Sequence, residues 1–308
     1  MDINKTKGEK LIYNNIYKIH RKSVYGYDEM KTIRMKLFKD FLDTVVWTAW
    51  LKDSRPVSSI LIALPEHCKT MLLEKYRYCD GIIYLADATA RGLQEELSTR
   101  YNNNKPINHI IIPDFLNILS RQQSSVRMML GFLNTIIYDG TASIKTHYTD
   151  FKLQSINSGL ITCITTAKFL EKSKLWENIG FISRVIPISY TYSLKTKLEI
   201  AEEIKRSAMK NETLQSEHAI CQFPKEKELV TFRNEQLGNQ IKEIALLLPQ
   251  QMLPNSKREM VAGFRLEESL FSLCKAEALK NDRYDVENGD VDKVIEYTKY
   301  MNLQFKEV

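Results

Sequence analysis

Short, unbroken apolar runs recur along the first two thirds of the sequence, and stretches with helical spacing separate them. A strand that is buried on both faces of a sheet is apolar throughout, and parallel strands are joined by crossover connections that are usually helical. The sequence therefore predicts an α/β fold with a parallel sheet that helices flank. The expected strands lie within residues 58–64, 81–87, 109–114, 159–166 and 181–192.

Helical spacing fills the gaps between these runs. Apolar residues recur every three or four positions in the segments 69–77, 91–101 and 124–137, as they do within residues 10–50. Residues 138–150 differ, because a glycine turn followed by a β-type segment is typical of a small hairpin.

The C-terminal third of the sequence has a different character. Residues 194–210 and 226–308 have helical periodicity, and only the run 228–232 resembles a strand. We therefore expect an α/β core over residues 1–192, which includes a basic helical arm, and a helical domain over residues 193–308.

The composition is that of an ordinary soluble globular protein, with 44% apolar and 27% charged residues. No stretch approaches the roughly 18 consecutive apolar residues that a membrane-spanning helix needs, and the polar N-terminus predicts no signal peptide. The five cysteines lack the spacing of a zinc site, which favours free thiols in a reducing compartment. We expect a cytoplasmic protein with no membrane partner.

The net charge of +6 is concentrated near the N-terminus, because residues 1–40 carry ten Lys or Arg residues and five acidic residues. A basic arm of this kind binds nucleic acid through phosphate contacts that release counterions. A solvated basic surface without a partner is the alternative, since charge alone identifies partners only loosely.

The first apolar run leads into the segment Ala63-Leu64-Pro65-Glu66-His67-Cys68-Lys69-Thr70. This segment is similar to the phosphate-binding loop G-x-x-x-x-G-K-[ST], in which the glycines let the backbone wrap phosphates, the Lys reaches them and the hydroxyl binds Mg²⁺. Lys69 and Thr70 are present, whereas Ala63 and Cys68 replace both glycines. The alternative is an ordinary strand-to-helix turn with a surface lysine.

A carboxylate, Asp114, follows the third apolar run. An acid at the carboxyl end of a buried strand, beside a phosphate-binding loop, is where the Walker B aspartate holds Mg²⁺. We therefore predict that Thr70 and Asp114 hold a magnesium ion. The alternative is that Asp114 caps the helix that follows.

Further segments follow one another in the order that one protein family has. Ser23–Lys31 reads S-V-Y-G-Y-D-E-M-K, Gly180–Arg184 reads G-F-I-S-R, and Phe264–Leu270 reads F-R-L-E-E-S-L. With the segments between them, the chain resembles the AAA+ superfamily of P-loop ATPases, and most closely its minichromosome maintenance (MCM) helicase branch, over most of residues 20–300. The intervening matches are Leu130–Asn134, Asp139–Gly140 and Ser143–Lys145, which resemble the helix and hairpin ahead of sensor 1.

The resemblance implies an AAA+ P-loop core followed by a C-terminal α-helical lid, with a site for ATP and Mg²⁺. Lys69 and Thr70 would contact the phosphates and the metal, and Asp114 would also hold the metal. Thr165 or Thr166 would stand at sensor 1, where the family usually has Asn. The rest of the loop would line the nucleotide: Ala63, Pro65, Glu66, His67 and Cys68.

Three basic residues acquire roles from the same resemblance. Arg184 would act as an arginine finger in the site of a neighbouring subunit, and its alternative is a solvated surface arginine. Arg265 would be sensor 2 and contact the γ-phosphate from the lid, and its alternative is a helical pair with Glu268. Lys145, on the expected hairpin, would contact a DNA phosphate.

The catalytic signature is incomplete. Phe115 stands where the family has the glutamate that polarises water, and losing a comparable group lowers a rate by ~10²–10³-fold. Because Phe115 replaces this glutamate, and Ala63 and Cys68 replace the glycines, we expect nucleotide binding rather than fast hydrolysis. If the protein is an enzyme, we expect a slow ATPase. Glu66 is an acid inside the loop that could substitute.

Two functions are consistent with these features. The first is an MCM-like, helicase-like ATP-binding protein that assembles as a ring or filament around DNA, in replication or maintenance of a phage or mobile-element genome. It would be a homo-oligomer, contact the DNA backbone without sequence preference, and rely on a second protein for targeting. The second is a degenerate, non-hydrolysing AAA+ scaffold that mediates protein–protein assembly.

Overall fold

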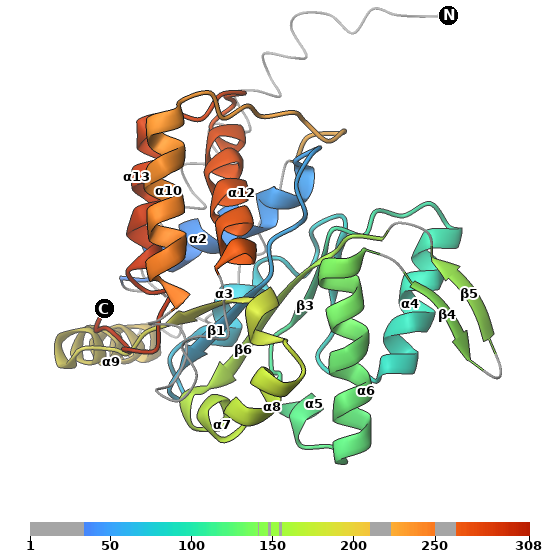
Figure 1. The fold of residues 1–308 in the computed structure, drawn as a ribbon. Helices are drawn as coiled ribbons and strands as arrows, with labels where there is room; N and C mark the ends of the chain where they lie inside the picture. Colours follow the sequence, from blue (N-terminus) through green and yellow to red (C-terminus); the bar gives the residue numbers. More distant parts are fainter. Residues whose placement is uncertain (1–33, 141, 147–148, 154–155, 210–222, 250–262) are drawn as a thin grey trace, which may run out of the picture. The chain divides into compact units, whose positions relative to one another are not determined.

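The computed structural model describes residues 34–140, 142–146, 149–153, 156–209, 223–249 and 263–308 (Figure 1). The chain divides into two compact units. The smaller unit includes residues 34–36, 192–209 and Val308, and within it Arg34 forms an ion pair with Glu199 of helix α9 (Leu194–Met209). The larger unit contains every element of the candidate site. Most of the predicted basic arm lies outside the described residues.

A five-stranded parallel sheet forms the centre of the larger unit. Each predicted apolar run contains one of its strands, so the α/β prediction is confirmed. The strand order is β2-β3-β6-β1-β7, which places β6 between β1 and β3. The strands are β1 (Ser59–Ala63), β2 (Ile82–Tyr84), β3 (His109–Ile112), β6 (Gly159–Thr165) and β7 (Ile186–Ser189).

The connections between the strands are mainly helical, as the spacing predicts. Helix α3 (Lys69–Glu74) joins β1 to β2, and α4 (Ala90–Asn102) joins β2 to β3. The long connection from β3 to β6 contains α5 (Leu116–Leu119), α6 (Gln123–Asn134), the π-helical turn η2 (Thr135–Asp139), and the predicted hairpin, β4 (Ala142–Thr146) with β5 (Thr149–Leu153). Between β6 and β7 lie α7 (Thr166–Glu171), α8 (Ser173–Asn178) and the 3₁₀ turn η3 (Ile182–Arg184).

The helices cover the two faces of the sheet unequally. The chain leaves β1 toward the β2 edge but travels toward the β7 edge afterwards, so right-handed crossovers place α3 on one face and the later helices on the other. Side chains of α4 to α8 share one apolar cluster with the sheet, and within the described residues no side chain of α3 belongs to it.

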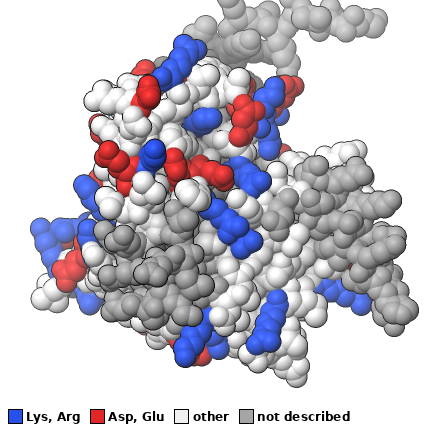
Figure 2. Space-filling view, viewed as in Figure 1, with Lys and Arg blue, Asp and Glu red and all other residues white. Residues whose placement is uncertain are grey.

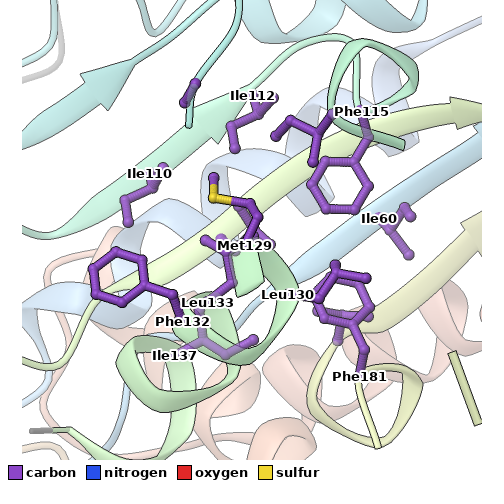
Figure 3. Packing of buried hydrophobic residues seen from close by; sticks show 14 of the residues in the cluster. Ile60, Ile110, Ile112, Phe115, Met129, Leu130, Phe132, Leu133, Ile137 and Phe181 are labelled. Atoms are coloured by element: carbon purple, nitrogen blue, oxygen red, sulfur yellow. The ribbon is translucent and has the colours of Figure 1, made fainter. Parts of the chain in front are cut away.

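That cluster is the main hydrophobic core (Figure 3). Ile110 and Ile112 of β3 point toward Met129 and Leu133 of α6, and all four are at most 2% exposed. Burying a side chain of this size contributes about 1.5–3 kcal/mol relative to leaving it exposed. The core therefore fixes the position of α6 and of the turn that follows β3.

The C-terminal helices pack together and against the start of the larger unit (Figure 1). Buried Glu277 of α12 accepts a hydrogen bond from the Tyr297 hydroxyl at 2.5 Å and pairs with Lys280 at 2.8 Å. The Thr44 hydroxyl also donates to Glu277, which joins α2 to this group. The helices are α2 (Lys36–Trp47), the 3₁₀ turn η1 (Thr48–Trp50), α10 (Glu235–Leu247), α12 (Phe264–Lys280) and α13 (Asn288–Thr298).

Two sequence expectations need correction or restatement. Residues 228–232 form isolated bridges rather than a strand, because Glu228 pairs with Leu51 and Thr231 with Asp285 only. Cys79 is disulfide-bonded, so the expectation of free thiols is wrong for this residue; spacing along the chain does not report which cysteines meet in space. Among the described helices, none has the length and apolar character to cross a membrane.

Candidate functional site

The loop between β1 and α3 contains two non-glycine residues with left-handed backbone. Lys69 and Thr70 begin α3, as predicted. Glu66 has φ 63° and Cys68 has φ 51°, both in the left-handed region that favours glycine. A residue with a side chain held there costs on the order of 1–3 kcal/mol. Tertiary contacts must therefore hold this loop in shape.

The Lys69 ammonium folds back over the loop. It donates to the carbonyl of Ala63 at 3.1 Å and to that of Leu64 at 2.5 Å. Burial lowers the pKa of Lys69, while the nearby Cys163 and Asp114 act in the opposite direction. The amine is thus at the end of β1 and within electrostatic reach of the carboxylate that follows β3.

Backbone N–H groups around Lys69 are available to a ligand. Within the described part of the chain, no hydrogen bond uses the amides of Glu66, Cys68 or Lys69. Successive amides in a turn of mixed right- and left-handed residues form a concave anion site. The loop therefore offers N–H donors and one ammonium to an anion such as a phosphate.

Asp114 has two neighbours that bear on its role. Its Oδ1 atom accepts the amide of Leu116, the first residue of α5, at 2.9 Å, although the N-cap residue of this helix is Phe115. The side chain is exposed, and its charge acts on Lys69. Because a carboxylate has a second oxygen, capping leaves room for a metal, and magnesium coordination by Asp114 stays a prediction.

Strand β6 lies between the two halves of the site. The Cys163 thiol donates to the carbonyl of Pro113, and a hydrogen bond with Thr70 also acts on it. Burial raises the pKa of Cys163 to about 12, so the thiol is neutral. Lys69, Thr70 and Asp114 therefore all act on one buried, uncharged side chain of the strand that separates β1 from β3.

The carboxyl ends of β1 and β6 form a topological switch point. The chain leaves these neighbouring strands toward opposite edges of the sheet, and open α/β sheets bind ligands at such a point. Thr165 ends β6 opposite Ala63, and Thr166 begins α7. The Thr166 hydroxyl is buried and has no hydrogen-bond partner among the described residues. Both threonines are thus at the edge where the loop lies.

Phe115 belongs to the core. It is fully buried and stacks on Trp176 and Phe181, with ring centroids 6.1 and 5.8 Å away. Figure 3 shows Phe115 and Phe181 in the same apolar cluster. The position that would carry a water-polarising glutamate therefore contributes an apolar ring to the fold, and no acid can be accommodated there without desolvation.

Arg184 and Arg265 lie at the other edge of the sheet. Arg184 precedes β7 and Arg265 is in the first turn of α12. Both contact the ring of Tyr138, with guanidinium carbons 5.5 and 4.2 Å from its centroid, and Arg55 lies 4.3 Å from the same ring. Arg55 precedes β1, so this arginine cluster is at the amino ends of the strands.

The arginine cluster carries a surplus of positive charge. Within the described part of the chain, neither Arg55 nor Arg265 forms an ion pair, so the proposed pair with Glu268 is absent. Arg265 instead donates to the Ser183 hydroxyl at 2.8 Å. In the space-filling view, a few basic side chains lie near the middle of the visible face with acidic ones beside them, and others are spread over the rest of that face (Figure 2).

The structure thus assembles two groups rather than one. It brings Lys69, Thr70 and Asp114 together, and it brings Arg184 to Arg265, but the arginines do not reach the loop of their own chain. Sequence reasoning missed Arg55 and Tyr138, because no local pattern marks residues from separate segments that converge on one ring. The Lys145 side chain lies outside what is described; its backbone is in β4.

Magnesium needs few protein ligands when a phosphate supplies the rest. Among the described residues, no group of three or more His, Cys, Asp or Glu side chains could hold a metal by itself. Thr70 and Asp114 fit the smaller role that the sequence predicts, since one hydroxyl and one carboxylate would be joined by phosphate oxygens and water.

Comparison with known proteins leaves the family open. No family model matches the chain, and no curated protein matches it. The AAA+ and MCM-like assignment is therefore a proposal that depends on the sequence segments and on the geometry described above.

Proposed function

We propose that this protein is an AAA+-type, MCM-like ATP-binding protein, with α10, α12 and α13 in the place of the lid. One observation carries the proposal: the loop with Lys69 and the turn with Asp114 lie at the same edge of the sheet, on either side of β6. The free amides of the loop support it, because they suit an anion.

Different residues of the site would bind the phosphates of ATP and the Mg²⁺ ion. Lys69 would exchange the neutral carbonyls of Ala63 and Leu64 for phosphate oxygens, so that donor and acceptor would both be charged and the hydrogen bond stronger. Thr70 and Asp114 would hold the metal, which neutralises phosphate charge when bound. Because Phe115 supplies no base, we propose slow turnover, with Thr165 or Thr166 orienting water.

Assembly would follow from the placement of charge. Phosphates at the carboxyl edge of one copy attract the arginine cluster at the amino edge of another, which is a heterologous contact that builds a ring or a filament. Arg184 and Arg265 would then act on a neighbouring copy. DNA would contact Lys145 and the basic N-terminal residues through phosphates, and a second protein would supply targeting in phage or mobile-element replication.

The test is calorimetric titration of ATP with Mg²⁺ into wild type, Lys69→Ala and the control Lys168→Ala. Lys168 is a lysine of α7 at the same edge, paired with Glu171 at 2.6 Å. Losing charged hydrogen bonds lowers affinity by roughly 10–100-fold in Lys69→Ala, and the control binds as wild type does. A wild type that binds no ATP contradicts the proposal.

The buried Phe115 favours a second candidate, a scaffold that assembles without hydrolysing ATP. In that case Lys69→Ala leaves the particle mass and partner binding unchanged. ATP turnover that disappears in Lys69→Ala or Arg184→Ala excludes the scaffold. Particle mass with and without ATP and DNA distinguishes the two functions directly.

A further inference from the structure

The loop between β1 and α3 has an unusual support. Glu66 and Cys68 are both left-handed, and the residue between them, His67, turns inward and is 6% exposed. The His67 Nδ1 atom lies 2.9 Å from the carbonyl oxygen of Pro65, so the ring bridges the turn from inside. A hydrogen bond inside the loop thus stabilises a conformation that glycine residues would adopt without such support.

A second contact fastens the same turn to the sheet. The Tyr190 hydroxyl donates to the carbonyl of His67 at 2.6 Å. Tyr190 follows β7, whose Ser189 is paired with Ile62 of β1, so it stands beside the point where the loop leaves the sheet. Its side chain is fully buried and its ring lies 4.5 Å from that of Phe38. The donor is therefore held rigidly.

We propose that Tyr190 is a positioning residue for the phosphate-binding loop: its hydroxyl holds the His67 carbonyl and so keeps Glu66 and Cys68 left-handed, although neither is a glycine. The proposal rests on the proposed function, because it names what preorganises that same site. In this proposal, a residue that follows strand β7 fixes the conformation of the loop, and the loop residues alone do not.

The test compares two tyrosines that each lose one hydroxyl. Tyr76 is as buried as Tyr190, and its hydroxyl donates to Asp43 at 2.6 Å, away from the loop carbonyls. ATP affinity with Mg²⁺ should fall by about tenfold in Tyr190→Phe, the equivalent of one lost hydrogen bond, and stay within about twofold of wild type in Tyr76→Phe.

A double-mutant cycle separates positioning from general damage. In a chain that also carries Glu66→Gly and Cys68→Gly, the left-handed conformation is no longer unfavourable. Adding Tyr190→Phe to that chain should change affinity by less than about threefold. An equal loss in both backgrounds overturns the proposal, because the hydroxyl would then act on something other than loop shape.

Hydrogen exchange without nucleotide keeps the inference testable if ATP does not bind. The Leu72 amide, which donates to the Cys68 carbonyl of the loop at 3.1 Å, should exchange about tenfold faster in Tyr190→Phe and at the wild-type rate in Tyr76→Phe. Unchanged exchange in Tyr190→Phe, or equal acceleration in β1 and β3, overturns the role of Tyr190. A wild type with no ATP binding but with this exchange pattern refutes the proposed function alone.

Discussion

The two edges of the sheet are built in different ways. At the carboxyl edge, Lys69 and Thr70 are adjacent residues at the start of α3, and Asp114 supplies an opposite charge. At the amino edge, Arg55, Arg184 and Arg265 come from three separate segments and meet on the ring of Tyr138. At the carboxyl edge two of the three residues form a local motif, whereas at the amino edge every residue comes from a separate segment.

The difference also concerns charge. The carboxyl edge combines an ammonium with a carboxylate, whereas Arg55 and Arg265 have no acidic partner among the described residues. Guanidinium ions such as those of Arg55 and Arg265 are suited to a phosphate that arrives from elsewhere. The comparison supports the proposal that the carboxyl edge binds the phosphates and that the amino edge completes the site of a second copy.

The largest expected effect separates the two edges by function. Arg184→Ala should reduce the wild-type rate of ATP turnover by ~10³-fold or more, as for an arginine finger, with little change in ATP affinity. The main effect of Lys69→Ala, in contrast, should be a loss of affinity for ATP. Mixing the two inactive variants should restore part of the activity, because one interface then pairs an intact Lys69 with an intact Arg184.

Activity in a mixture is measured as phosphate release at constant total protein. Recovery above the sum of the separate variants supports sites shared between copies. If the mixture stays inactive while both variants still assemble, the arginine cluster does not complete a second copy's site.

Restoring an acid beside Asp114 should harm the fold. Phe115→Glu removes a stacked ring and buries a carboxylate, which should lower the free energy of unfolding by about 3–5 kcal/mol. Leu116→Glu, at a half-buried neighbouring position, should cost clearly less. Urea denaturation of both variants is the measurement. A stable Phe115→Glu protein with faster turnover would show that the carboxyl edge tolerates a catalytic base.

Acid should weaken the amino end of β3. Burial lowers the pKa of His109 to about 4 from 6.5, with Lys227 acting in the same direction. As the pH falls, His109 is protonated in the unfolded chain before it is protonated in the folded one. The neutral, buried imidazole therefore adds its full contribution to the free energy of unfolding above about pH 6.5. It is lost as the pH falls toward 4, by up to about 3 kcal/mol. In urea denaturation between pH 7 and 4.5, His109→Gln should flatten the decline; an unchanged decline refutes the assignment to His109.

The smallest effect concerns Tyr138. Three cation–π contacts hold the arginine cluster together, each worth roughly 0.5–2 kcal/mol. Tyr138→Ala should weaken assembly, measured by particle mass across a dilution series, and leave ATP affinity at the loop unchanged. Tyr101→Ala, at an exposed tyrosine of α4, is the control. Loss of ATP affinity in Tyr138→Ala would mean that the two edges are not independent.

Local patterns predicted much of the architecture. The five apolar runs each contain a strand, because strands buried on both faces must be apolar throughout. The pair Lys69-Thr70 was placed correctly at the start of a helix, since the motif specifies its own strand–turn–helix context. The AAA+ identity, ATP, magnesium, DNA and the cytoplasmic location stay predictions.

The sequence alone determined which segments become strands and helices, and which loop carries the lysine, because both depend on side chains close together along the chain. Only the tertiary structure decided that β6 separates β1 from β3, that Phe115 belongs to the core, and that Arg55 joins Arg184 and Arg265. These outcomes depend on strand order and on packing between distant segments, and neither leaves a periodic signal in the chain.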